Sequence, residues 1–293
     1  MTSNGFANQS PMLGQMKRRM YFDTSAINWL FDHPYRDRLV ADIRDKAEVH
    51  ISIFTVAEMA STSSKERRTE LMRFARKITY NWRPLAWPGD LLRRSLDALV
   101  LQKENIEASM GAEWNGLWTA LCNPEAVEVE ECQEAIQWKN QQEEWYQTMH
   151  DEGRDHIPKA LSSLPEKERR LLYLRPSNVL RHFAGNKAYI AHLISEMAEH
   201  CGHKSISEGL LSEVLKLEDW RFFLAAMAYG LFVRSVQKEG FSKKRNPGSI
   251  DTQQAIYLAG CDVFATADWN QRTMVKWLLP LGYMRRKVSF FAT

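Results

Sequence analysis

Four carboxylic acids in this sequence stand next to short apolar segments. Asp23 ends one such segment, Glu58 lies one turn beyond a second, and Asp268 follows a third. Asp251 opens a segment with helical spacing shortly before the third. Four carboxylates gathered in one place repel one another and raise each other's pKa values unless a cation neutralises them. Carboxylate oxygens select Mg²⁺ or Mn²⁺, and such a site hydrolyses phosphodiesters by activating water and stabilising the leaving oxygen.

The segments beside these acids are expected to alternate between strands and helices. The strand candidates are short and rich in β-branched and aromatic residues, whereas the segments between them have helical spacing. Short links between alternating strands and helices are typical of a parallel sheet. The expected elements are strand 19–23, helix 24–31, strand 49–54, a helix from Thr55, helix 251–259, strand 262–266, helix 269–279 and strand 287–291.

The direction of these strands places the acids at one edge of the sheet. Ligands of open parallel sheets bind beyond the carboxyl ends of the strands, where Asp23 and Asp268 stand. Glu58 follows the second strand, and Asp251 can join the same edge if its helix runs antiparallel to the strands. Asp262 starts its strand and would lie about 15–20 Å from Asp268, so it is left out of the site.

Each acid also has a purely structural interpretation as a helix cap. Asp23 and Asp268 could cap the helices that follow them. Residues 55–58 (TVAE) and 251–254 (DTQQ) both fit the capping-box pattern. Capping explains any one acid as well as catalysis does, but four coinciding caps on one edge are a less economical explanation than one shared site.

The middle of the chain departs from the α/β pattern. Between residues 67 and 245, apolar residues recur at intervals of three and four, and residues 210–236 are expected to form one buried helix. We therefore expect one α/β domain, formed by residues 18–66 plus 246–293, that is interrupted by a large all-α insertion at 67–245. Residues 1–16 have the polar composition of a disordered leader. The basic residues that lead into the site, as candidate nucleic-acid contacts, are Lys243, Lys244 and Arg245.

Composition sets only broad limits on function. The 293 residues are 44% hydrophobic and 26% charged, which is ordinary for a globular protein. A net charge of +3 permits a nucleic-acid partner without requiring one. The chain shows no secretory signal, no CxxC pair and no apolar stretch long enough for a membrane span, so a reducing cytoplasmic setting without a membrane partner is expected.

The acids and their flanking residues resemble, in order, the motifs of PIN-domain nucleases. The first motif is an opening strand that ends in an aspartate followed by hydroxyl residues, and the last is a T-x-D at a strand end. No single motif is specific for this family. The four motifs in this order, each beside the expected strand or helix, are more specific. The matching segments are residues 21–27 (YFDTSAI), 52–59 (SIFTVAEM), 251–259 (DTQQAIYLA) and 262–268 (DVFATAD).

This resemblance implies a three-layer α/β/α domain with a central parallel sheet. It also implies a Mg²⁺- or Mn²⁺-dependent endonuclease that acts on single strands, more often of RNA than of DNA. By position, the metal ligands would be Asp23, Glu58, Asp251 and Asp268, and the supporting hydroxyls would be those of Thr24, Ser25 and Thr266. Stand-alone toxins of the VapC kind are far shorter and have no counterpart of the insertion.

Several alternatives stay open at this point. A toxin or phage-defence effector would have a regulatory protein partner, and the insertion could shape the substrate channel or form a homodimer contact. A catalytically silent nucleic-acid-binding or scaffolding protein would keep the sheet, but it would be expected to have lost an acid, and this chain keeps all four. A phosphatase of the haloacid dehalogenase kind needs a second aspartate where this sequence has Ser25.

Overall fold

Four short strands form one parallel sheet in the order β2-β1-β3-β4. In the register of this sheet, Tyr21 of β1 lies opposite His50 of β2 on one side and Phe264 of β3 on the other. The strand order reverses at β1, because β2 lies on one side of it and β3 on the other. The strands are β1 (Arg18–Phe22), β2 (Ala47–His50), β3 (Val263–Thr266) and β4 (Lys287–Phe290).

The structure is a computed structural model. It describes residues 17–101, 115–126, 129–174, 207–236, 247–281 and 287–290, with a few single positions between 178 and 199. The leader at 1–16 and the basic run of Lys243, Lys244 and Arg245 lie outside these residues.

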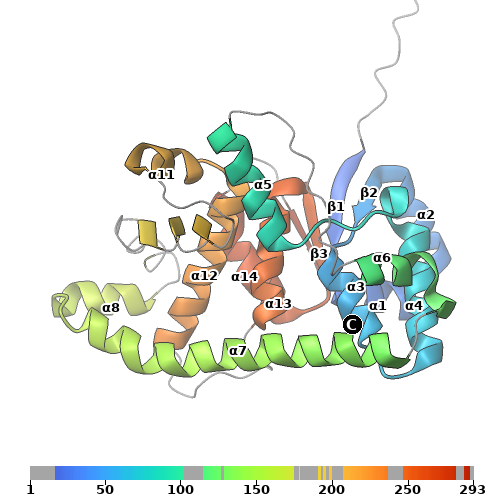
Figure 1. Cartoon of the computed structure of the whole chain (residues 1–293), viewed down its shortest axis with the longest axis horizontal. Coiled ribbons are helices and arrows are strands. Elements are labelled where there is room, and N and C mark those ends of the chain that lie inside the picture. The colour runs from blue at the N-terminus through green and yellow to red at the C-terminus, as the bar shows by residue number, and fades with distance from the viewer. Residues whose placement is uncertain are drawn as a thin grey trace, which may run out of the picture.

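Helices cover both faces of the sheet, so the chain has an α/β fold (Figure 1). Successive strand residues point to opposite faces. Tyr21 and Phe264 accordingly join one buried apolar cluster, and Phe22 and Ala265 join the other. The first cluster is completed mainly by α12 (Glu218–Val236), the 3₁₀ helix η4 (Ala255–Gly260) and α14 (Trp269–Leu278), and the second by α1 (Thr24–Asp32), α2 (Arg36–Lys46), α3 (Ile53–Ala60) and α4 (Lys65–Ile78).

The second strand is shorter than its sequence predicts. β2 ends at His50 and α3 begins at Ile53, whereas a strand to Phe54 and a helix start after Thr55 were expected. The reason is Ser52, whose Oγ accepts a hydrogen bond from the Thr55 backbone N–H and so caps α3. Ser52 is itself held by a hydrogen bond of 2.8 Å with the Tyr21 hydroxyl.

The described residues between 67 and 245 are mainly helical. Two isolated bridges, from Val49 to Thr79 and from Ser52 to Leu85, run along the free edge of β2. The helices that follow are α5 (Pro88–Leu101), α6 (Asn115–Cys122), α7 (Val129–Leu161), α8 (Glu166–Leu174) and α11 (Glu208–Val214), with η1 (Tyr80–Trp82) and η3 (Pro124–Ala126) between them.

The single helix expected over residues 210–236 is wrong, because the chain breaks between α11 and α12. Leu215 ends α11, and the backbone N–H of Leu217 donates to the Val214 carbonyl in the turn that follows. Glu218 and Asp219 then occupy the first turn of α12, where acidic side chains stabilise a helix N-terminus.

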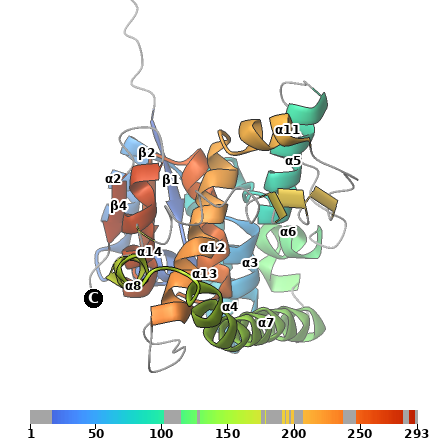
Figure 2. The ribbon, with the colours of Figure 1, turned by 90° about the vertical axis from the view of Figure 1, so that its left-hand side faces the viewer.

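Helix α7 is 33 residues long and crosses the α/β part of the molecule. Figures 1 and 2 show it running beneath α12, α13 and α3, and it contacts all three. The helix α13 (Ser249–Gln254) carries Asp251, and α3 carries Glu58. The central segment of the chain is therefore packed directly against two elements that hold predicted site residues.

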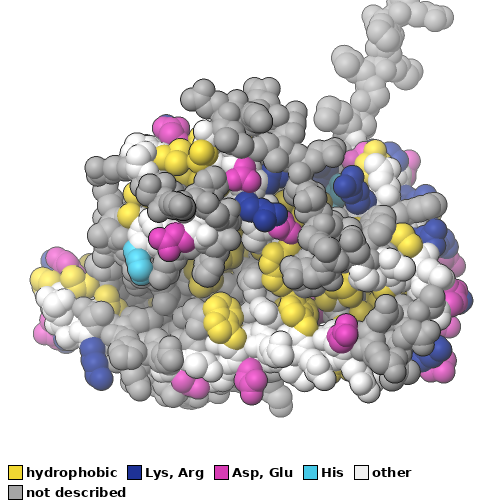
Figure 3. All heavy atoms as spheres, in the orientation of Figure 1, with side chains coloured by type: hydrophobic (Ala, Val, Ile, Leu, Met, Phe, Trp, Pro, Cys, Tyr) yellow, Lys and Arg dark blue, Asp and Glu magenta, His cyan; other side chains and the backbone are white. Residues whose placement is uncertain are grey.

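The surface is of mixed charge where it is described. On the face in Figure 3, Lys and Arg side chains alternate with Asp and Glu, most densely at the end formed by α2 and α4. Within the described residues, no helix combines the length and apolar character that crossing a lipid bilayer requires.

Replacement of the buried Trp220 tests the packing of α12 on α5. Trp220 is 0% exposed, and its Nε1 donates to the Leu92 carbonyl (3.2 Å) and the Ser95 hydroxyl (3.1 Å). We expect Trp220→Ala to lower the free energy of unfolding by about 3–5 kcal/mol because it leaves a large cavity. The measurement is urea denaturation followed by circular dichroism. Trp145→Ala, at a side chain that is 51% exposed, is the control; an equal loss in both variants would contradict this packing.

Candidate active site

Asp23 lies directly after β1 and caps α1. Its carboxylate is 3% exposed and accepts hydrogen bonds from the Ala26 backbone N–H (2.7 Å) and from the Ser25 hydroxyl (2.8 and 2.9 Å to its two oxygens). Burial raises the pKa of Asp23 to about 7, hydrogen bonds from Thr266, Ala26 and Ser25 oppose that rise, and the charge of Glu58 adds to it.

Asp268 stands beside Asp23, across the junction of β1 and β3. Its backbone N–H donates to the hydroxyls of Ser25 (3.0 Å) and Thr266 (2.9 Å). Its carboxylate caps α14 by accepting from the Gln271 backbone N–H (2.8 Å). Ser25 and Thr266 are themselves 3.1 Å apart, so these two hydroxyls join the ends of the two strands.

Glu58 lies in the second turn of α3 and is not part of a capping box, because Ser52 rather than Thr55 caps that helix. Its Oε2 accepts a hydrogen bond of 2.5 Å from the Thr24 hydroxyl. Its Oε1 lies 3.3 Å from Nζ of Lys139, which belongs to α7. The Glu58 side chain is 17% exposed, and its charge acts on Asp23 and Asp251.

Asp251 is the third residue of α13, and the cap position that the sequence assigned to it belongs to Gly248. The Asp251 carboxylate reaches back to accept from the Gly248 backbone N–H (2.9 Å). Burial raises the pKa of Asp251 well above its ordinary value, and the charges of Glu58, Asp268 and Asp23 raise it further.

The fold therefore brings the four predicted acids within electrostatic range of one another. Asp23 and Asp268 follow β1 and β3, the neighbouring strands between which the strand order reverses. Open α/β sheets bind their ligands at such a reversal, beyond the carboxyl ends of the strands. Thr24, Ser25 and Thr266 each contact one or more of these acids through a hydroxyl.

The donor chemistry of this edge suits a hard divalent cation. Neighbouring carboxylates repel one another, and this repulsion raises their pKa values. A bound cation that prefers oxygen ligands neutralises their charges and removes the repulsion. As the side chains stand in the described part of the chain, no three His, Cys, Asp or Glu residues form a ready-made metal cluster.

Helix α7 adds polar residues that sequence reasoning did not assign to the site. Lys139 pairs with Glu58, and the Tyr146 hydroxyl lies 2.9 Å from that of Thr252 in α13. A second omission is the buried amide pair in which Gln271 Nε2 donates to Gln254 Oε1 (2.7 Å). The sequence signal for these residues was the helical spacing of polar side chains along α7. That spacing shows which residues share a face, but not what the face contacts.

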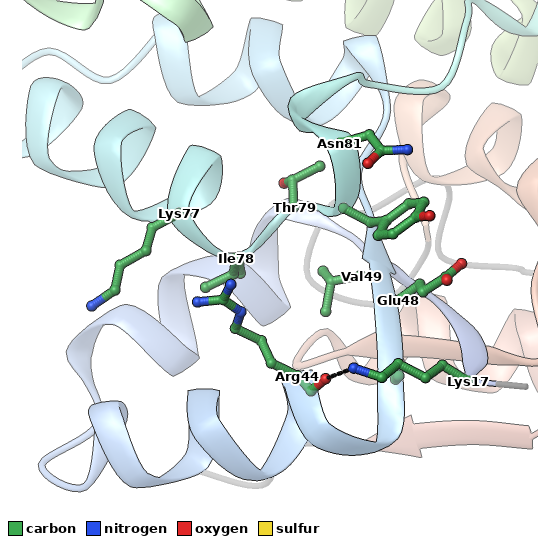
Figure 4. Close-up of a pocket in the computed structure, with 10 residues that line it drawn as sticks. Lys17, Arg44, Glu48, Val49, Lys77, Ile78, Thr79 and Asn81 are labelled. Atoms are coloured by element: carbon green, nitrogen blue, oxygen red, sulfur yellow. Dashed lines mark hydrogen bonds between the residues drawn. The ribbon is translucent and has the colours of Figure 1, made fainter. Parts of the chain in front are cut away.

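A separate hollow of about 530 Å³ lies at the amino ends of β1 and β2, away from the acids. Figure 4 shows Lys17 Nζ donating to the Arg44 carbonyl (2.7 Å) at its floor, with Lys77 and Asn81 at its rim. Its lining is mixed, with three basic residues and one acid, and it contains none of the four predicted site acids, so it is distinct from the candidate site.

The chain matches no protein-family model, no curated protein and no solved structure. Function must therefore be inferred from the site itself.

The pH dependence of stability tests the burial of Asp23. A carboxyl group whose pKa rises from 3.8 to about 7 on folding binds its proton more tightly in the folded chain. The free energy of unfolding therefore falls as pH rises through this window, by at most about 1.4 kcal/mol per pH unit. We expect Asp23→Asn, measured by urea denaturation in EDTA, to show a shallower fall. Identical slopes in both chains would show that Asp23 titrates as an ordinary surface acid.

Proposed function

We propose that this chain is a Mg²⁺- or Mn²⁺-dependent endonuclease that hydrolyses phosphodiester bonds in RNA on a PIN-like α/β domain. The observation that carries the proposal is that the fold brings Asp23 and Asp268 together at the carboxyl end of the sheet, where Ser25 hydrogen-bonds both residues. The charge of Glu58 acts on Asp23 and on Asp251. Burial and repulsion make such a cluster costly. A protein that only bound or scaffolded nucleic acid would have no need to keep all four acids together.

The fold supports the same proposal. Parallel strands with helices on both faces are the three-layer arrangement that the resemblance to PIN-domain nucleases implies. The preference for RNA rests on that resemblance alone.

The roles of the residues follow from their contacts. Ser25 and Thr266 fix the strand ends that carry Asp23 and Asp268, and Thr24 orients Glu58. When bound, the divalent cation would supply Lewis-acid activation of water and of the scissile phosphate. Asp23, Glu58, Asp251 and Asp268 would hold that cation beyond the carboxyl ends of β1 and β3.

An exposed aromatic residue beside the acids suits a nucleic-acid substrate. Trp269 directly follows Asp268 and is 63% exposed, and the Arg272 guanidinium lies 4.7 Å from its ring centroid. Unpaired bases stack on such rings, and arginine contacts phosphates. These two side chains could therefore hold a nucleotide next to the acidic edge.

Removing one carboxylate at a time tests the site. We expect Asp23→Asn and Asp268→Asn to reduce cleavage of single-stranded RNA by about a thousandfold or more, because each removes a charge that holds the cation. Both Asn variants keep an oxygen that can cap the following helix, so circular dichroism should be unchanged. Asp262→Asn is the matched control, since Asp262 precedes β3 at the opposite end and accepts from the Arg19 backbone N–H. Full activity in either site variant would reject the assignment.

A cation and substrate panel tests the reaction class. We expect the wild-type chain to cleave single-stranded RNA with Mn²⁺ or Mg²⁺, to lose this activity in EDTA, and to cleave structured RNA and DNA more slowly. Gel analysis of end-labelled oligonucleotides gives the rates. Cleavage that persists in EDTA would exclude the metal mechanism, and faster cleavage of DNA would reverse the substrate assignment.

A further inference from the structure

One polar face of α7 lies against the elements that carry Glu58 and Asp251. Its residues are spaced by three and four positions, as one face of a helix requires. Lys139 reaches Glu58 (3.3 Å), Gln142 accepts from the Gln253 side chain (3.3 Å), and Tyr146 contacts Thr252 (2.9 Å).

Helix α7 approaches the N-terminus of α13 closely, at Gly248. A Cβ atom at Gly248 would lie 2.7 Å from Oε1 of Glu143, which is nearer than real Cβ contacts come. Gly248 also donates its backbone N–H to Asp251. Glu143 of α7 therefore lies close to the residue whose backbone N–H binds the Asp251 carboxylate.

Lys139 is the positively charged residue of this face, and it lies beside Glu58. Its Nζ pairs with Oε1 of Glu58, while Oε2 of Glu58 is taken by Thr24. The Lys139 side chain is 39% exposed and can rotate about its flexible stem. An ion pair of this exposure contributes little to stability, so the fold alone gives weak reason for a lysine here.

We propose that Lys139 is a substrate-positioning residue that α7 supplies to the nuclease site. In the absence of a divalent cation it neutralises Glu58. When a divalent cation occupies the acids, Lys139 releases Glu58 and binds a non-bridging oxygen of the substrate phosphate. This inference rests on the proposed nuclease function. It assigns the central helical segment a direct part in binding the phosphodiester backbone.

The test replaces Lys139 in the full-length chain and measures two quantities. The first is the affinity for Mn²⁺ alone, by titration calorimetry without nucleic acid. The second is kcat/KM for a single-stranded oligoribonucleotide. Because Lys139 competes with the cation for Glu58, we expect Lys139→Gln to tighten Mn²⁺ binding about two- to fivefold. Because the phosphate loses a charged contact, we expect kcat/KM to fall about 10- to 100-fold.

Matched variants separate this role from simple docking of α7. Lys159→Gln removes a lysine at an exposed position of the same helix and should change neither quantity. Tyr146→Phe removes a docking hydrogen bond without a charge and should not tighten Mn²⁺ binding. Lys139→Arg keeps the charge and should restore most of the lost cleavage. Lys139→Met, which keeps the apolar stem, replaces the Gln variant if that variant fails to fold.

The outcomes distinguish the two proposals. A wild-type chain that neither binds Mn²⁺ nor cleaves RNA would overturn the nuclease function, and the role of Lys139 would fall with it. A wild-type chain that does both, with unchanged or weaker Mn²⁺ binding in Lys139→Gln, would overturn the role of Lys139 alone. The role of Lys139 would also be overturned if Lys139→Gln left cleavage unchanged. It would be overturned as well if Lys139→Arg were as inactive as Lys139→Gln.

Discussion

Parallel pairing of β1 with β3 joins two segments that are far apart in the sequence. Across this junction, the Ser25 hydroxyl accepts from the backbone N–H of Asp268, 243 positions away, and the Asp23 N–H donates to the Ala265 carbonyl. The entropic cost of closing so long a loop grows only with the logarithm of its length. Packing of α7 and α12 against the α/β elements offsets part of that cost. Without this pairing Asp23 and Asp268 would not share an edge, so the candidate site depends on it.

Asp23 and Asp268 are helix N-caps, and Asp251 accepts a hydrogen bond from Gly248, the cap residue of its own helix. All three are also members of the acidic group. The two functions are compatible because a carboxylate has two oxygens and about four acceptor positions. The N-terminus of α1 favours the ionised form of Asp23. Burial and neighbouring charges favour protonation, and they dominate at Asp23 and Asp251, whose pKa values are raised. Added positive charge therefore stabilises the ionised carboxylates at this edge of the sheet.

The sequence predicts those features that depend on local signals. The sequence places β1 before Asp23 and β3 before Asp268 correctly. An apolar strand followed by an acid that caps a helix is a pattern of only a few consecutive residues, so it can be recognised locally. The end of β2 was misplaced because Ser52 is held by Tyr21, which is distant in sequence. Membership of the PIN-domain family remains a prediction, since it rests on motifs and not on a match to a known protein.

The contacts of the polar face of α7 could not be predicted from the sequence, for a different reason. Helical spacing indicates that Lys139 and Glu143 share a face, but not that this face meets the acids. That fact comes from the packing of α7 against α3 and α13, which the residue spacing along α7 does not encode. Helix α7 contacts α3 and α13, the helices that carry Glu58 and Asp251. Changes in α7 should thus act on the charge balance of the acidic edge as well as on stability, because the helix contributes the cation that faces Glu58.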